Sequence, residues 1–240
     1  MKIFPAIDIK DGKVVRLKYG DYGQMCTYSQ TPFEALASFA ADGADHVHIV
    51  DLDGAKDGYP VNFALISRLT AAPGFFSEVG GGIRTLESIQ SYLTYGAGRV
   101  ILGTAALQNR ELLQQAVDLY GSRLAVGVDA RDGKVAVEGW LHTSGQDSYS
   151  FCRELQELGV EAVIYTDISR DGAMEGCNMA AYEKLSRIEG LRITASGGIS
   201  SLKEIAALRD MGIDAAILGK ALYNGTLKLA DVLAVAKGER

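Results

Sequence analysis

Two aspartates stand where apolar runs end, and they are the best-placed carboxylates for acid–base chemistry. Asp8 follows the apolar residues 4–7, and Asp129 follows the apolar residues 125–128. A carboxyl group at such a place is partly desolvated, which shifts its pKa as general acid–base catalysis requires. Each aspartate could instead cap backbone groups at its strand end. Because the two occupy equivalent places in an internal repeat, we favour catalysis.

Three further aspartates follow two other apolar runs. Asp51 and Asp167 each end a run, and Asp171 lies four residues after Asp167 in a segment that reads DISRDG. Asp171 could face the same site as Asp8 and Asp129. For Asp51 and Asp167, a catalytic role and a loop-stabilising role are equally expected.

Two glycine-rich turns could each bind a phosphate group. Residues 80–84 (GGGIR) and 196–200 (SGGIS) lie between an apolar run and a predicted helix start, where backbone N–H groups can approach an anion. One such turn is weak evidence, because tight strand–helix turns use glycine anyway. Each turn, however, has a partner at a matching distance, residues 103–104 (GT) and 219–220 (GK). The predicted phosphate-binding residues are Gly81, Gly82, Arg84, Gly103, Thr104, Ser196, Gly197, Gly198, Gly219 and Lys220. The arginine and the lysine among them would supply positive charge.

The histidines and the tryptophan give weaker signals. His46, His48 and His142 do not have the spacing of a metal site, and we interpret His46 and His48, on one face of a strand, as packing residues. Trp140 lies in a long loop after the fifth apolar run. It either anchors that loop at the surface or offers a plane on which an aromatic substrate stacks. We predict neither a metal nor a cofactor.

These residues recur because the chain repeats itself. Segments 50–52, 81–83 and 101–105 recur 116 residues later, at 166–168, 197–199 and 217–221. Segment 8–15 recurs 121 residues later, at 129–136. The first half therefore has five extra residues between its first two strands. They fall within residues 18–30, which contain Gly20 and Gly23 and which we predict to be a lid.

Eight short apolar runs alternate with longer amphipathic stretches. Near-continuous apolar strands are typical of a parallel sheet covered on both faces. Thr31, Pro32 and Glu34 predict one helix start, and Ser201 with Glu204 predicts another as a capping box. The predicted strands are residues 3–9, 46–50, 75–79, 100–102, 124–128, 162–166, 191–195 and 215–218.

Two copies of four strand–helix units predict an α/β fold, a (β/α)8 TIM barrel. We expect one domain over residues 1–240, built from half-barrels of about 1–121 and 122–240. A doubly wound open sheet is the alternative. In a barrel, Asp8 and Asp129 would lie on opposite sides of the mouth formed by the strand ends.

Composition limits the classes of partner that the chain is expected to bind. The chain has 240 residues, a formal net charge of −6 and 48% hydrophobic residues, and it offers no field that would attract nucleic acid or an anionic membrane. No signal peptide or membrane-spanning run is visible. The cysteines Cys26, Cys152 and Cys177 lack metal-ligand spacing and fit reduced thiols. We expect a cytoplasmic protein and a monomer, and the two predicted anion sites lead us to expect a small bisphosphate substrate as its partner.

Over essentially its full length, the sequence resembles the histidine-biosynthesis isomerases that act on phosphoribosylformimino-aminoimidazole carboxamide ribotide. No single motif carries the resemblance, but together the motifs are specific. The matching segments are residues 5–8 (PAID), 14–17 (VVRL), 48–55 (HIVDLDGA), 80–84 (GGGIR), 139–140 (GW), 166–172 (TDISRDG) and 196–199 (SGGI).

The resemblance implies an Amadori rearrangement of an aminoaldose to an aminoketose, without a metal or redox cofactor. An acid would protonate the ribose ring oxygen, and a base would remove the proton on C2. The family's base falls on Asp8, and its acid falls on Asp129 or Asp171. The two glycine-rich turns would hold the two phosphates. The substrate-contacting positions of the family fall on Arg16, Trp140 and Thr166.

Three other functions share part of this pattern. The sister cyclase of the pathway typically starts with Cys-Leu-Asp, where this chain has Ala6-Ile7-Asp8. A dual-substrate isomerase that also uses phosphoribosylanthranilate typically has an arginine before the Gly-Trp pair, where this chain has Glu138. A non-catalytic phosphometabolite-binding barrel is the third, and the presence of both acids and both turns argues against it.

Overall fold

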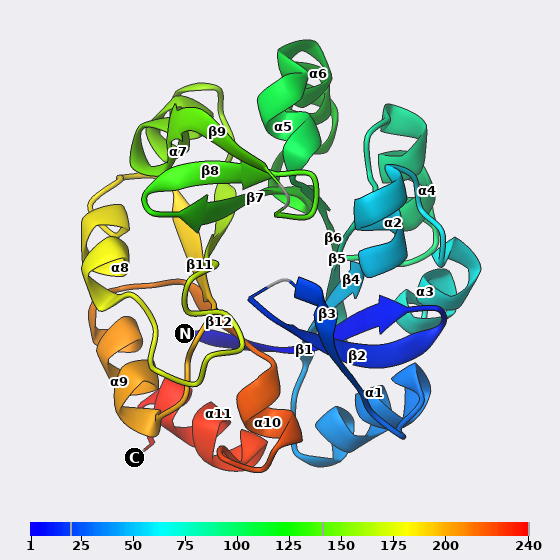
Figure 1. Cartoon of the computed structure of the whole chain (residues 1–240), viewed down its shortest axis with the longest axis vertical. Coiled ribbons are helices and arrows are strands. Elements are labelled where there is room, and N and C mark those ends of the chain that lie inside the picture. Colours follow the sequence, from blue (N-terminus) through cyan, green and yellow to red (C-terminus); the bar gives the residue numbers. More distant parts are fainter. Residues whose placement is uncertain (20, 141, 240) are drawn as a thin grey trace.

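A closed ring of parallel strands forms the centre of the molecule. The computed structural model describes residues 1–19, 21–140 and 142–239. Seen end-on, the strands surround one axis and the helices surround the strands (Figure 1). Around the ring, β1 pairs with both β4 and β12, and β7 pairs with both β6 and β10. The barrel strands are β1 (Lys2–Lys10), β4 (His46–Asp51), β5 (Phe76–Gly80), β6 (Arg99–Leu102), β7 (Leu124–Arg131), β10 (Ala162–Asp167), β11 (Arg192–Ser196) and β12 (Ala215–Leu218). This closure confirms the predicted (β/α)8 barrel and excludes the open sheet.

Helices follow the strands and cover the outside of the barrel. The predicted capping box at Thr31 is present, with Glu34 N to Thr31 Oγ1 at 3.2 Å and Thr31 N to Glu34 Oε2 at 2.7 Å. The helices are α1 (Pro32–Ala41), α2 (Leu52–Asp57), α3 (Phe63–Thr70), α4 (Leu86–Thr94), α5 (Thr104–Gln108), α6 (Arg110–Tyr120), α7 (Ser148–Glu157), α8 (Met179–Leu185), α9 (Leu202–Asp210), α10 (Lys220–Tyr223) and α11 (Leu229–Lys237), with a 3-10 turn η1 (Gly121–Arg123) before β7.

The second predicted capping box is formed only in part. Ser201 Oγ accepts the N–H of Glu204 at 3.4 Å, as predicted. The Glu204 carboxylate, however, accepts the backbone N–H groups of Cys177 at 2.6 Å and Ser200 at 3.1 Å. Glu204 therefore ties the loop before α8 to the start of α9 instead of completing the box on Ser201.

Antiparallel hairpins extend β1 and β7 beyond the barrel. β2 (Lys13–Lys18) pairs with β1 and with β3 (Asp21–Thr27), and β8 (Lys134–Val137) pairs with β7 and with β9 (His142–Asp147). These two extensions lie over different parts of the ring in Figure 1. Residues 18–30, predicted as a loop, thus contain a strand, and Gly20 lies outside the described residues. Lid motion of this segment stays a prediction.

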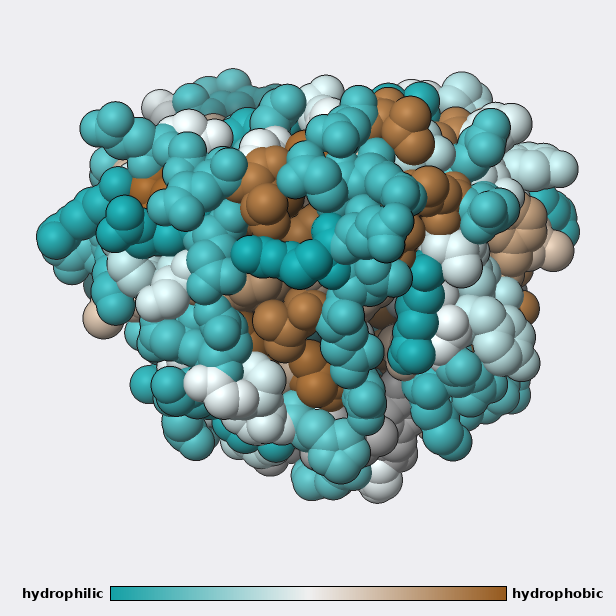
Figure 2. All heavy atoms as spheres, turned by 90° about the horizontal axis from the view of Figure 1, so that it is seen from above, coloured by the Kyte–Doolittle hydropathy of each residue, from teal (hydrophilic) through white to brown (hydrophobic). Residues whose placement is uncertain are grey.

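The core has two parts. One lies between strands and helices, and the other fills the inside of the barrel with side chains such as Phe4, Ile101, Ile164 and Ile217. Viewed from the side, the surface is mostly hydrophilic, with smaller hydrophobic areas between (Figure 2). In the described part of the chain, no helix is long and apolar enough to cross a membrane.

Candidate active site

A cavity opens where the barrel strands end, and every predicted site residue lines it. The strand register explains the gathering. Asp8 is level with Val50, and Val50 is level with Gly80. On the other side of the ring, Thr166 is level with Asp129 and with Ser196. The first polar residues after the apolar runs therefore meet at one height of the barrel.

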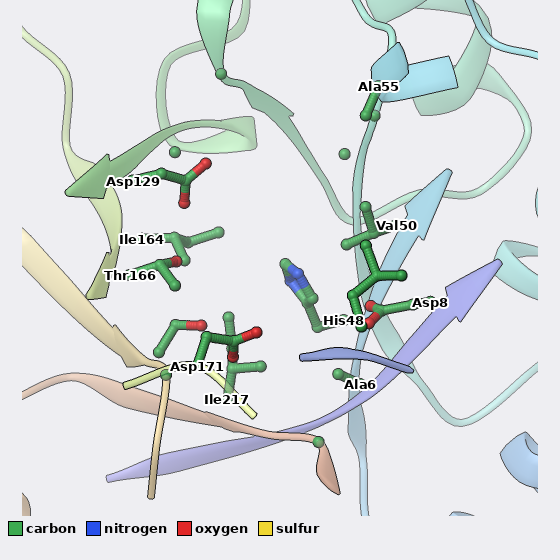
Figure 3. A pocket seen from close by; sticks show the side chains of 18 of the residues that line it. Ala6, Asp8, His48, Val50, Ala55, Asp129, Ile164, Thr166, Asp171 and Ile217 are labelled. Atoms are coloured by element: carbon green, nitrogen blue, oxygen red, sulfur yellow. The ribbon is translucent and has the colours of Figure 1, made fainter. Parts of the chain in front are cut away.

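Asp8 lies on one side of the cavity and Asp129 lies on the other, and Asp171 also lines the cavity (Figure 3). Asp8 pairs with the Arg16 guanidinium, which β2 brings back beside β1. Arg16 is buried, donates to the carbonyl of Ala6 and lies 4.8 Å from the centre of the Tyr223 ring. Burial disfavours its charge, but Asp8 and Tyr223 outweigh burial and raise the pKa of Arg16. Arg16 thus remains a cation against the Asp8 carboxylate.

Asp129 sits in a drier and less charged surrounding. Burial raises the pKa of its carboxyl group, while hydrogen bonds from the side chains of Trp140 and Thr166 and the nearby His48 act against that rise. Two donors aimed at one carboxylate favour its ionised form. Asp129 is therefore held between desolvation, which favours the acid, and two hydrogen bonds, which favour the anion.

The loop that carries Trp140 has an unusual backbone. Glu138, Gly139 and Trp140 have φ values of 57°, 63° and 71°, in the left-handed region that bulky residues rarely adopt. The N–H of Glu138 donates to Thr104 Oγ1 at 2.8 Å. This bond fixes the start of the turn, and the turn directs the indole into the cavity. Trp140 is therefore a cavity residue and not a surface anchor.

Asp171 has a carboxyl group with a strongly raised pKa. Burial raises the pKa of Asp171 to about 7, and the charges of Asp8 and Asp129 add to the rise. Its loop is held from two directions. The Tyr19 N–H donates to the Asp171 carbonyl at 3.2 Å, and Lys220 Nζ donates to the Gly172 carbonyl at 2.8 Å. A carboxyl group with a pKa near neutrality can both give and take a proton.

Asp51 and Asp167 support loops and do not line the cavity. The buried Asp51 carboxylate accepts the N–H groups of Gly54, Val61 and Asn62 at 2.7–2.9 Å. Asp167 accepts from Ser169 and Asn178 in the equivalent loop of the second half. Of the two roles left open for this pair by the sequence, the structure supports loop stabilisation.

The two glycine-rich turns require glycine. Gly81 and Gly82 have φ values of 101° and 74°, and Gly197 and Gly198 have values of 93° and 82°. A Cβ atom on Gly81 would lie 2.1 Å from the carbonyl oxygen of Asp51. The first turn is followed by Thr85, the N-cap residue of α4, and the second by Ser201, the N-cap residue of α9. Both turns line the cavity, and each lies directly before a helix start, which suits a ligand with two anionic ends.

His48 corrects the sequence interpretation. His46 does pack in the barrel, with its ring centre 4.9 Å from that of Phe4 and 5.5 Å from that of Phe76. His48 instead lines the cavity, and its Nδ1 lies 2.7 Å from Glu78 Oε1. The two histidines share a strand face. His48 lies two residues further along the strand than His46, and this brings it to the mouth of the barrel. Across residues 1–19, 21–140 and 142–239, no group of three His, Cys, Asp or Glu residues is placed to hold a metal ion.

Comparison with known proteins gives a consistent picture. The family model described as "Histidine biosynthesis protein" matches residues 2–228. A relative from Brachyspira hyodysenteriae is 44% identical over 237 residues, which cover 99% of this chain and 100% of that protein. A relative from Halothermothrix orenii is 47% identical over 230 residues, 95% of this chain and 97% of that protein. Both are named 1-(5-phosphoribosyl)-5-((5-phosphoribosylamino)methylideneamino)imidazole-4-carboxamide isomerase.

Proposed function

Because this chain belongs to the family of histidine biosynthesis proteins, we propose that it catalyses the isomerisation for which its relatives are named. The reaction is an Amadori rearrangement of the phosphoribosylamino group, an aminoaldose, to the aminoketose. The substrate carries two phosphoribosyl groups and so has a phosphate at each end. A small-molecule biosynthetic reaction fits the cytoplasmic location and the monomeric state that we expect.

One observation carries the proposal. Carboxyl groups face each other across a cavity that also contains two glycine-rich turns, one from each half of the barrel. An aldose–ketose isomerisation requires a base at one carbon and an acid at the ring oxygen. A substrate with two phosphates requires two anion sites separated by the reacting group. Both requirements are met around one cavity by residues of the described chain.

We assign the acid to Asp171 and the base to Asp8. Asp171, with a pKa of about 7, still holds its proton in part of the molecules at neutral pH. That proton goes to the ribose ring oxygen, the bond from C1 to this oxygen breaks, and the C1–N bond becomes an iminium. Asp8, paired with the Arg16 guanidinium, then removes the C2 proton, and the electron pair forms the enolamine. Transfer of the C2 hydroxyl proton to solvent and protonation of C1 give the ketone.

Asp129 then has a different task. It accepts hydrogen bonds from Trp140 and Thr166, so its carboxylate holds the indole and the hydroxyl against the substrate. Its negative charge also lies close enough to raise the pKa of Asp171. Asp129 therefore positions two substrate contacts and keeps the acid protonated.

The phosphates are assigned to the two turns. One site comprises the backbone of Gly81 and Gly82 with Gly103, Thr104 and Arg84. The other comprises Gly197 and Gly198 with Ser196, Gly219 and Lys220. Lys220 Nζ, which now bonds the Gly172 carbonyl, lies at the edge of the cavity and can exchange that carbonyl for a phosphate oxygen.

The proposal is tested by turnover of the aminoaldose bisphosphate by purified protein in the presence of a chelator. Phosphoribosylanthranilate is assayed alongside as a second substrate. We expect formation of the aminoketose from the first substrate and at most slow turnover of the second, since Glu138 stands where dual-substrate isomerases have arginine. Comparable turnover of both would show a dual-substrate isomerase. Binding without turnover of either would overturn the proposal in favour of a phosphometabolite-binding barrel.

A further inference from the structure

A row of three polar side chains lies inside the barrel at the floor of the cavity. Strand register makes them neighbours: His48 of β4 is level with Glu78 of β5, and Glu78 is level with Arg99 of β6. Glu78 Oε1 lies 2.7 Å from His48 Nδ1, and Glu78 Oε2 accepts from Arg99 Nε at 3.1 Å and from its Nη2. Glu78 is fully buried, and the Arg99 side chain is 6% exposed. The three side chains form one connected row.

Closing the barrel does not require these charges. The 116-residue repeat places Ile164, Thr194 and Ala215 at the equivalent positions of the second half, and the same register aligns them. That half fills the equivalent layer with uncharged side chains, all buried. Because burial of an ion pair often costs more than its attraction returns, the charged row is a poor device for stability alone.

The row fixes the state of the His48 ring. Burial alone would raise the pKa of Glu78, but His48 and Arg99 outweigh it and hold that pKa below its usual range. An ionised carboxylate can only accept hydrogen bonds, so His48 Nδ1 must carry the hydrogen that Glu78 receives. With Nδ1 committed to Glu78, Nε2 is the ring nitrogen left for a ligand. Within the described residues, no protein group hydrogen-bonds to Nε2, and the ring lies in the cavity between Asp8 and Asp129 (Figure 3).

We propose that His48 binds a hydroxyl group of the substrate's sugar through Nε2, and that Glu78 and Arg99 are positioning residues that fix its ring and tautomer. This inference rests on the proposed isomerase function and adds a contact at the reacting sugar. A hydrogen bond from the hydroxyl to Nε2 holds the sugar carbons at the floor of the cavity, with the proton on C2 towards Asp8. The two phosphate sites fix the ends of the substrate, whereas His48 fixes its middle.

Kinetics of His48→Gln and Glu78→Gln test the contact, with His46→Gln as the matched control. His46 lies on the same strand and the same face but packs on Phe4 and Phe76, away from the mouth. We expect His48→Gln to lower kcat on the order of 10²-fold, because the reacting carbons are misplaced. KM should change little, because the phosphates dominate binding. His46→Gln should keep kcat within about twofold of wild type.

Nitrogen-15 NMR of the imidazole rings tests the row without reference to activity. The chain has three histidines, so single substitutions assign the signals. Wild-type His48 should show the Nδ1–H tautomer, and Glu78→Gln should shift it towards Nε2–H with a parallel loss of kcat. If Glu78→Gln does not fold, Glu78→Thr with Arg99→Ala copies the second half and removes both charges together.

The outcomes separate this inference from the proposed function. Absence of turnover by the wild-type protein would overturn the proposed function and the sugar contact with it. Normal turnover by wild type and by His48→Gln would overturn the sugar contact alone. A His48 tautomer and a kcat that do not respond to loss of the Glu78 charge would overturn the positioning role of the row.

Discussion

At the scale of single residues, the three carboxyl groups of the site differ in the charged and polar groups that surround them. Asp8 faces the buried guanidinium of Arg16, whereas Asp171 is half-buried near two other carboxylates and has no ion pair of its own among the described residues. An ion pair at Asp8, and desolvation with two nearby carboxylates at Asp171, assign the two halves of acid–base catalysis to different residues. Asp129 differs from both, because its partners are the neutral hydrogen-bond donors Trp140 and Thr166.

The pKa of Asp171 predicts the alkaline side of the pH profile. An acid with a pKa of about 7 loses its proton above that pH, so kcat/KM should fall about tenfold per pH unit beyond pH 7. The measurement is kcat/KM from pH 5.5 to pH 9 for wild type and Asp129→Asn. If Asp171 is the acid, the variant is slower but keeps a descending limb. A profile that stays flat to pH 9 in the wild type, or loses its limb in Asp129→Asn, would contradict the assignment.

At the scale of elements, the strand ends and the turns after them form the site. The glycine-rich turns combine left-handed backbone with close approach to the neighbouring loop, and Asp51 and Asp167 hold those loops in place. The hairpins β2–β3 and β8–β9 add what the barrel strands lack, because they deliver Arg16 to Asp8 and Trp140 to Asp129.

Gly81→Ala tests the requirement for glycine in the first turn. A methyl group there would lie 2.1 Å from the Asp51 carbonyl oxygen, at a φ of 101°. We expect a loss of at least about 2 kcal/mol in the free energy of unfolding, measured by urea denaturation, and weaker substrate binding. Gly145→Ala is the control, since its added Cβ would meet no atom within 4 Å. Equal stability of the two variants would show that the turn can relax.

Much of this arrangement could be predicted from the sequence, because it depends on periodicity. The repeat and the apolar runs located seven of the eight barrel strands to within one residue at each end, and with them Asp8, Asp129 and the glycine-rich turns, whereas β7 runs three residues further than predicted. The hairpins were missed, although Asp11-Gly12 and Asp132-Gly133 are a strong signal for two-residue hairpin turns. Both pairs have positive φ and connect paired strands, as that signal indicates.

Other features depend on depth and on contacts between distant elements, which periodicity does not encode. His46 and His48 have the same place in the alternation of β4, and only their height in the closed barrel distinguishes a packing residue from a cavity residue. The balance of charges around Asp171 combines residues from four separate segments of the chain. A sequence pattern can bring such residues to one end of a barrel, but it does not determine which of them pair.

At the scale of the whole molecule, the two half-barrels contribute similar parts to one cavity. Each half supplies an aspartate at its first strand and a glycine-rich turn after its third. The halves differ in the layer below, where one has His48, Glu78 and Arg99 and the other has uncharged side chains. The parts that the two halves share therefore match the two phosphate ends of the substrate. The row of His48, Glu78 and Arg99, which only one half has, matches the one sugar that reacts.

Ligand-induced stabilisation tests whether both anion sites are used together. A ligand that binds only the folded protein raises its stability in proportion to the logarithm of its concentration relative to Kd. The bisphosphate product should therefore raise Tm more than ribose 5-phosphate at the same concentration, because its second phosphate binds at high effective concentration. Lys220→Gln should reduce this advantage. Equal shifts for the two ligands in the wild-type protein would mean that only one anion site operates.

The most direct test of the account is the behaviour of Asp8→Asn, because the rearrangement cannot proceed without a base at C2. Turnover of the aminoaldose bisphosphate is followed for wild type and variant, and calorimetry measures binding of the same substrate to each. The account predicts that the variant binds with a Kd within a few-fold of the wild-type value and loses activity by on the order of 10³-fold or more. Near-normal turnover by Asp8→Asn would contradict it, since the proton on C2 would then be removed by another group.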